Sequence, residues 1–129
     1  TTPLAEKLGF KPGMRVFTAD MPAGVRAEIA LDSLGLELLA APSVGIDAAH
    51  VFVTERARLD CELAALRQLI APSGFVWVSW PKKAAKMDTD IIEDTIREIA
   101  LPLGLVDVKV CAIDETWSGL KLMIRKELR

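Results

Sequence analysis

The stretch FVWVSW, residues 75–80, constrains the fold of this chain more than any other feature. Five of its six residues are apolar, and they occupy both faces of an extended strand. A strand that is apolar on both faces is covered on both sides, as in a parallel sheet between two layers of helices. A half-exposed strand would instead alternate apolar and polar residues. The stretch therefore predicts a sheet with helices on both faces.

Segments of strand and helix character alternate along the chain. We expect a helical turn within residues 1–10, strands at 14–20, 36–41, 49–54, 75–80, 106–113 and 120–126, and helices at 21–31, 55–70 and from 88–90 to 103. Asp90 and Glu93 have the spacing of a capping box at the start of the last helix. Gly104 is expected to end it in a left-handed conformation.

This alternation predicts one α/β domain over residues 1–129, a size that suits one domain. We expect a three-layer αβα sandwich with a mostly parallel, Rossmann-like sheet of about six strands and right-handed crossovers. The last strand, 120–126, follows its neighbour after a short loop. It should therefore run antiparallel to the rest.

Composition argues against several classes of function. The formal charge is only −2, with acids and bases interspersed, so we expect no nucleic-acid partner. No apolar run is long enough to cross a bilayer, and no basic-then-apolar leader opens the sequence. Cys61 and Cys111 lie far apart, without metal or redox spacing, and are interpreted as buried reduced thiols of a cytoplasmic protein. His50 is the single histidine, so we expect no metal site.

Ligands of open parallel sheets bind beyond the carboxyl ends of the strands. The residues that the sequence places there form the candidate ligand site: Asp20, Thr54, Ser79, Trp80, Lys82, Lys83, Asp114, Trp117 and Ser118. Trp80 and Trp117 are expected to converge on one cleft beside the lysine pair. Alternation along the strand places Trp77 on the face opposite Trp80, within the core.

Each candidate has a structural alternative. The two indoles can plug a filled cleft instead of lining a site. Lys82 and Lys83 can belong to a solvated loop. Asp20 can cap the helix that follows it, and Asp114 can serve only the hairpin turn. His50 enters its strand from the opposite edge and is interpreted as structural, which leaves Ser79 and Ser118 without a histidine and predicts no catalytic residue.

Three stretches carry a resemblance to a known fold: LGFKPGMRVFTAD (8–20), GIDAAHVFVT (45–54) and LRQLIAPSGFVWVSWPK (66–82). They resemble the class I methyltransferases that use S-adenosylmethionine. In that family an acid and a glycine-rich loop follow the first strand, and an acid at the end of the second strand binds the ribose. Residues 77–90 and 104–121 also resemble a small bacterial family defined as a domain of unknown function.

The chain departs from the methyltransferase pattern at both cofactor features. Asp20 is present, but Gly24 is the only glycine of the loop, and Met21 and Pro22 fill the turn. The second strand ends in alanine and proline, because Glu37 comes too early. The third strand and its helix are missing between residues 42 and 47.

From these departures we expect a non-catalytic module without a cofactor, which binds a small molecule or a protein partner. The alternative is a minimal S-adenosylmethionine-dependent methyltransferase. Self-association is a further alternative that the sequence leaves open.

Overall fold

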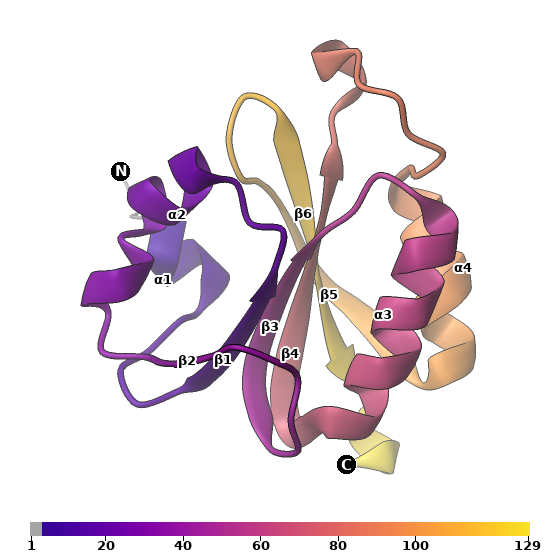
Figure 1. The fold of residues 1–129 in the computed structure, drawn as a ribbon. Helices are drawn as coiled ribbons and strands as arrows, with labels where there is room; N and C mark the ends of the chain where they lie inside the picture. Colours follow the sequence, from indigo (N-terminus) through magenta and orange to yellow (C-terminus); the bar gives the residue numbers. More distant parts are fainter. Residues whose placement is uncertain (1–3) are drawn as a thin grey trace.

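The strand that contains residues 75–80 runs through the middle of a six-stranded sheet in the computed structural model, which describes residues 4–129 (Figure 1). The strands are β1 (Arg15–Ala19), β2 (Glu37–Leu39), β3 (Ile46–Phe52), β4 (Ile70–Pro81), β5 (Leu105–Ala112) and β6 (Trp117–Ile124). The helices are α1 (Leu4–Leu8), α2 (Ala23–Ile29), α3 (Arg56–Leu69) and α4 (Glu93–Ala100). Short 3₁₀ turns follow at η1 (Leu31–Ser33), η2 (Lys83–Ala85), η3 (Leu101–Leu103) and η4 (Lys126–Leu128). Residues 1–3 of the expected first turn lie outside the described residues.

The strand order is β2-β1-β3-β4-β6-β5. The pairs β2–β1, β1–β3 and β3–β4 are parallel, whereas β6 is antiparallel to both β4 and β5. Because β5 is antiparallel to β6, it runs in the same direction as the first four strands. The predicted mostly parallel sheet with an antiparallel last strand is therefore confirmed, with β6 beginning at Trp117.

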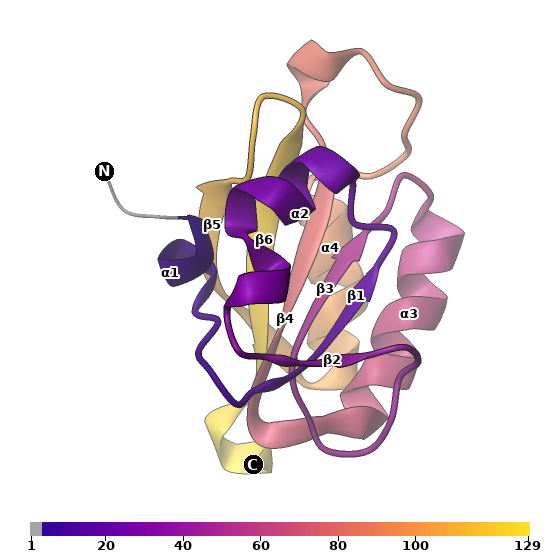
Figure 2. The same ribbon diagram turned by 60° about the vertical axis from the view of Figure 1, so that its left-hand side comes forward.

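Two separate cores cover the two faces of the sheet, as FVWVSW predicts. Helices α1 and α2 cover one face, and α3 and α4 cover the other (Figures 1 and 2). Trp77 belongs to the core under α1 and α2, is fully buried, and donates its indole N–H to the Leu8 carbonyl at 2.8 Å. Trp80 belongs to the core under α3 and α4. The predicted separation of the two indoles by face is confirmed.

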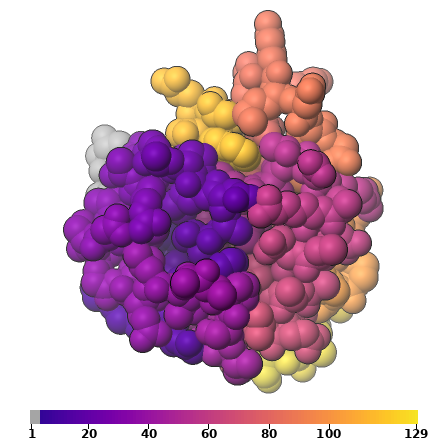
Figure 3. Space-filling model, in the orientation of Figure 1, coloured from indigo at the N-terminus to yellow at the C-terminus, as the bar shows by residue number. Residues whose placement is uncertain are grey.

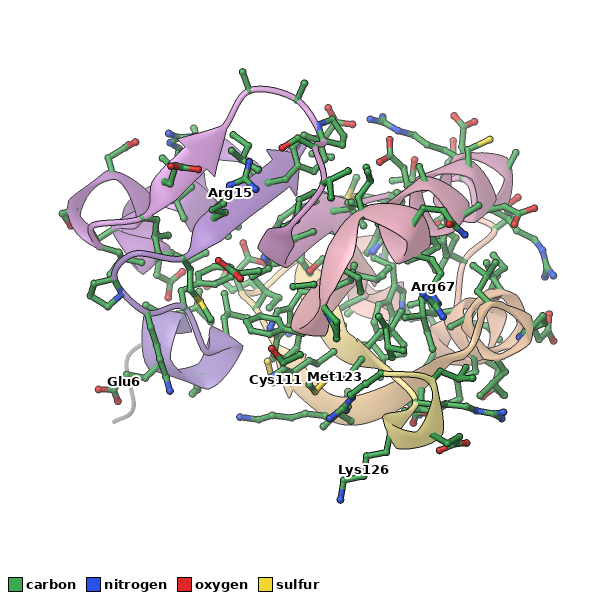
Figure 4. All side chains as sticks on the ribbon, turned by 90° about the horizontal axis from the view of Figure 1, so that it is seen from below. Glu6, Arg15, Arg67, Cys111, Met123 and Lys126 are labelled. Carbon is green, nitrogen blue, oxygen red and sulfur yellow. The ribbon has the colours of Figure 1, made fainter. Side chains whose placement is uncertain are left out.

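A loop, residues 40–45, connects β2 directly to β3, as the missing third strand and helix predict. Arg15 holds this loop at the amino end of β1, where Figure 4 labels it. Its guanidinium donates to the Val44 carbonyl at 2.6 Å and to the Ser43 hydroxyl at 3.0 Å. It also donates to Glu37 at 2.8 Å. Glu37 therefore lies at the edge of the sheet opposite the candidate site, which confirms that it comes too early to bind a ligand there.

The predicted capping box at Asp90 and Glu93 is wrong. Helix α4 begins only at Glu93, and the Thr95 hydroxyl accepts the Ile92 N–H at 3.1 Å. The Asp90 carboxylate instead accepts the Arg56 N–H, at 2.6 Å, in the first turn of α3. An acid at a helix start satisfies a free N–H and suits the helix dipole whether it comes from the same segment or another. Asp90 thus caps the neighbouring helix.

The ends of the remaining segments follow the sequence more closely. Gly104 ends the helical segment formed by α4 and η3, at φ 82°, as expected. Both cysteines are free thiols, but Cys61 is exposed on α3 and Cys111 is half-buried, so the expectation that both are buried is wrong. Burial raises the pKa of the Cys111 thiol.

Across residues 4–129, every helix is too short or too polar to cross a membrane.

Candidate functional site

Trp80 and Trp117 lie at the carboxyl rim of the sheet but on its opposite faces. Trp80 pairs with Ser118 across the β4–β6 ladder, and Pro81 pairs with Trp117. Directly paired residues share a face, whereas successive residues alternate. The prediction that the two indoles converge on one cleft is therefore wrong. The pairing of the hairpin, which the sequence does not give, decides the face on which Trp117 lies.

A crevice of about 260 Å³ opens between the ends of β1 and β3. Six residues line it, and we name it the rim crevice: Asp20, Phe52, Thr54, Glu55, Arg58 and Trp117. The rings of Phe52 and Trp117 meet edge to face, with centroids 5.1 Å apart and planes at 81°. This arrangement is a favourable one for an aromatic pair. The rim crevice therefore has an aromatic wall next to charged groups.

Asp20 and Arg58 form an ion pair at the mouth of the rim crevice. Asp20 follows β1 in the left-handed conformation, with φ 56°. Arg58 reaches it from the first turn of α3. Helix α2 begins after Pro22, and no side chain of the described residues caps its start. The alternative in which Asp20 caps this helix is therefore wrong, and Arg58 is the partner of Asp20.

Ser79 lies in the core, not at the rim, and it is paired with His50. The His50 Nε2 and the Ser79 Oγ are 2.7 Å apart, and both residues are fully buried. Strand β3 begins at Ile46, so His50 lies well inside it and not at the opposite edge. Burial lowers the pKa of His50 to about 3, which keeps the imidazole neutral near pH 7.

The ring of Phe52 stacks on His50, with centroids 4.4 Å apart, and the same ring lines the rim crevice. Within the described residues, the His50 Nδ1 is a buried polar atom without a hydrogen-bond partner. The sequence-based expectation that Ser79 has no histidine is wrong, yet both members of the pair are inaccessible to solvent. The pair is therefore structural.

Trp80, Lys82 and Lys83 line a second hollow, of about 390 Å³, on the α3–α4 face. Its other lining residues are Pro81, Met87, Thr89, Ile91 and Ile92. We name it the lysine hollow. The lysine hollow lies on the segment that follows β4. This segment rises beside the β5–β6 hairpin at the top of the molecule (Figure 3).

Asp114 and Ser118 belong to the β5–β6 hairpin. The Asp114 carboxylate accepts the N–H groups of Thr116 and Trp117 at 2.8 and 2.7 Å, as short polar side chains do in turns. Asp114 borders a separate shallow hollow with Gly24 and Glu28. Ser118 is half-buried in the ladder opposite Trp80. The nine candidates thus divide among two cavities, the core and the hairpin.

Phe52, Glu55 and Arg58 are the residues of the rim crevice that are absent from the sequence-based candidates. Arg58 lies three positions after Glu55, so the two side chains lie on the same side of the first turn of α3. Because Glu55 closely follows β3, that side of the helix is next to the end of the strand. This spacing could have identified Arg58. Among residues 4–129, no group of three or more His, Cys, Asp and Glu side chains is arranged to hold a metal ion.

The fold is similar to that of solved S-adenosylmethionine-dependent methyltransferases. One from Aquifex aeolicus has 17% identity and a TM-score of 0.60, with 92% of this chain and 86% of that one covered. The ribosomal protein L11 methylase of Lactobacillus delbrueckii subsp. bulgaricus has 12% identity and a TM-score of 0.61, with 95% and 75% covered. Fibrillarin of Aeropyrum pernix, solved with natively bound S-adenosylmethionine, has 10% identity and a TM-score of 0.58, with 93% and 73% covered.

At these identities the similarity shows the fold alone, which is the class I methyltransferase-like fold expected from the sequence. No protein-family model and no curated protein sequence matches the chain. The resemblance to a small bacterial family therefore stays a prediction.

Proposed function

We propose that this domain is a non-catalytic module that binds a small molecule in the rim crevice. The observation that carries this proposal is the position of the Asp20–Arg58 ion pair beside the rings of Phe52 and Trp117. The crevice lies where parallel α/β sheets bind their ligands, outside the carboxyl ends of neighbouring strands. It combines an apolar wall with a few polar groups, which is the usual composition of a ligand site.

The loop after β1 supports a role without the methyltransferase cofactor. Met21 packs against the core under α1 and α2, and Pro22 has no N–H to offer a ligand. Gly24 is the only glycine that this loop contains. Asp20 already has a cationic partner in Arg58. A cofactor that needed the free Asp20 carboxylate would have to break that pair.

The end of β2 supports the same interpretation. The strand ends at Leu39, and its acid, Glu37, is bound to Arg15 at the far edge of the sheet. The neighbouring end of β2 therefore has no carboxylate for ribose hydroxyls. The volume of about 260 Å³ falls below the roughly 300–1,000 Å³ of sites for drug-sized ligands. A molecule the size of a nucleobase or an aromatic amino acid matches it better than a complete adenosyl cofactor.

Such a ligand would place a flat apolar part against Trp117 and Phe52 and a polar group near Thr54 and Arg58. Aromatic stacking supplies affinity, and the guanidinium supplies orientation and a preference for an acceptor group. Catalysis is not part of this proposal, because His50 is buried and neutral and the remaining ionisable groups at the crevice are Asp20, Glu55 and Arg58.

A thermal-shift screen tests the proposal. The panel contains adenine, adenosine, adenosine monophosphate, tryptophan, S-adenosylmethionine and S-adenosylhomocysteine. A ligand at a hundred times its dissociation constant adds about 2.7 kcal/mol to the free energy of unfolding. We expect a small planar compound to raise the melting temperature of the wild type by several degrees, and Trp117→Ala and Arg58→Ala to abolish that shift.

Arg26→Ala is the matched control, because Arg26 forms a comparably exposed ion pair with Asp32 away from the crevice. This variant should retain the full shift. A panel without effect on the wild type, or a shift that survives both crevice variants, would contradict the proposal.

The second candidate function is a minimal methyltransferase. It is favoured by the similarity to methyltransferase folds and by fibrillarin of Aeropyrum pernix, solved with its S-adenosylmethionine bound. This alternative requires that S-adenosylmethionine itself bind tightly, and calorimetry separates the two candidates.

A further inference from the structure

We propose that the lysine hollow is a second binding site, for a small aromatic carboxylate, on the face of the sheet opposite the rim crevice. The proposal is independent of what the rim crevice binds. Ser118 shares the face of Trp80, and Pro81 that of Trp117, so the indoles of the two cavities are separated by the thickness of the sheet.

The floor and one wall of the lysine hollow are apolar. Trp80 is 8% exposed and Ile91 is 1% exposed, so both are packed into the core below. Met87 and Ile92 are 42% and 64% exposed, which is high for large apolar side chains. Methionine adapts its shape to flat ligands and makes favourable contacts between sulfur and aromatic rings. An aromatic ring would remove this apolar surface from water.

The rim of the hollow is cationic. Lys82 and Lys83 line it, and Lys86 follows one turn later. In the part of the chain that the structure describes, no ion pair involves these three lysines. A lysine that gains a carboxylate partner forms a charge-assisted hydrogen bond, which is stronger than one between neutral groups. The free ammonium groups therefore favour an anionic head group.

The acids of the same loop are directed elsewhere. Asp88 and Asp90 line a neighbouring hollow with Thr54 and Glu55. The Asp90 carboxylate is bound to the Arg56 N–H at 2.6 Å. Glu93, in the first turn of α4, pairs with Arg97 at 2.7 Å. None of these carboxylates lines the lysine hollow, so the positive charge at its rim is not cancelled within the cavity.

The loop is held at both ends, so the hollow exists before a ligand arrives. At its start, the Lys82 N–H donates to the Thr116 carbonyl at 2.8 Å and extends the β4–β6 ladder. At its end, the Thr89 hydroxyl donates to the Thr54 carbonyl at 2.7 Å and accepts the Ile91 N–H at 3.1 Å. A preformed site loses less entropy on binding than one that must be ordered.

The volume fits the proposed class of ligand. About 390 Å³ lies within the range of small-molecule sites. A benzene or indole ring would stack near Trp80, between Met87 and Ile92, and a short chain would carry the carboxylate to Lys82 or Lys83. A purely inorganic anion would leave the apolar wall uncovered.

The test is a titration of the ¹⁵N-labelled protein with 4-phenylbutyrate, followed by amide chemical shifts. We expect saturable shifts at Lys82, Lys83, Met87 and Ile92 and at the Trp80 indole N–H, with a dissociation constant below about 1 mM. The amides of Asp20 and Arg58, which line the rim crevice and not the lysine hollow, should not move. Absence of saturable shifts, or shifts confined to the rim crevice, would overturn the proposal.

Two further ligands separate the contributions of ring and charge. The uncharged amide 4-phenylbutyramide should bind about tenfold more weakly, which corresponds to about 1.4 kcal/mol. Inorganic phosphate alone should cause no saturable shifts. Equal affinity for the acid and the amide would show that the lysines are not used and would overturn the proposal.

Variants on exposed positions avoid the risk of unfolding. Lys82→Gln combined with Lys83→Gln should weaken 4-phenylbutyrate about tenfold or more. Lys126→Gln should have no effect, because Lys126 lies in η4, at the end of the molecule opposite the segment after β4 (Figure 1). Ile92→Ser should weaken it, whereas Val44→Ser, at a position that is 76% exposed on the far loop, should not. Equal effects of the site and control variants would contradict the assignment.

Discussion

The imidazole of His50 and the hydroxyl of Ser79 form a buried hydrogen bond, 2.7 Å long, between the neighbouring strands β3 and β4. His50 is the single histidine of the chain. Phe52 covers the imidazole on one side. This pair has a measurable consequence for stability, because a neutral, buried imidazole resists protonation.

The pH dependence of stability should report His50 directly. Burial lowers the pKa of His50 to about 3 in the folded chain, against 6.5 for the free side chain. The unfolded chain therefore binds the proton first, and stability is full above pH 6.5 and falls progressively as the pH drops toward 3. We expect urea denaturation to show a loss of about 1.4 kcal/mol between pH 7.5 and pH 5.5.

His50→Gln removes the titrating group while retaining a side chain that can hydrogen-bond to Ser79. Its free energy of unfolding should be nearly independent of pH in the same window. Most carboxylates titrate below this range, so they contribute little to the slope. An equal slope in the wild type and the variant would show that His50 is not responsible.

Trp77→Ala should destabilise the domain more than Trp80→Ala. Trp77 is fully buried and donates to the Leu8 carbonyl, so its removal leaves a large cavity and an unpaired acceptor. Truncation of a buried tryptophan costs about 3–5 kcal/mol. Trp80 is 8% exposed and borders the lysine hollow, so its truncation leaves a smaller closed cavity.

Denaturant midpoints of the two variants, measured side by side, check this order. Equal losses would show that Trp80 acts wholly as a core side chain. Trp80 would then not form the floor of the proposed second site.

Asp90 stabilises α3 although it lies 34 positions after the residue that it caps. Asp90→Ala should lower the free energy of unfolding by about 1 kcal/mol, as loss of a helix cap does. Asp88 is an exposed acid in the same loop, and within residues 4–129 it makes no such contact with α3, so Asp88→Ala should stay within about 0.5 kcal/mol of the wild type. If chemical denaturation gives the two variants the same stability, the carboxylate of Asp90 does not cap α3.

The layers and the strand directions follow from patterns that the sequence displays. The doubly apolar stretch 75–80 requires cover on both faces, and the short link between β5 and β6 requires an antiparallel pair. The absent third strand is also visible, because only a short loop separates the second and third apolar runs. These features depend on the residue types and lengths of short segments, which can be read directly from the sequence.

The candidate site depended on information that the sequence does not contain. A shift of one residue in the pairing of β6 exchanges the faces of all its side chains, so the face of Trp117 could not be predicted from the turn sequence. The position of His50 could not be predicted either, because polar Asp47 obscured the true start of β3 at Ile46. The ion pair between Arg58 and Asp20 and the cap that Asp90 forms at Arg56 join segments that are distant in sequence.

Isothermal titration calorimetry with S-adenosylmethionine tests the central claim most directly. The loop after β1 holds Met21 and Pro22 where the family has glycines, Asp20 is paired with Arg58, and β2 ends without an acid. We predict no binding in the micromolar range for the wild-type domain. Micromolar affinity, equivalent to about −8 kcal/mol, would contradict the account and would favour the methyltransferase instead.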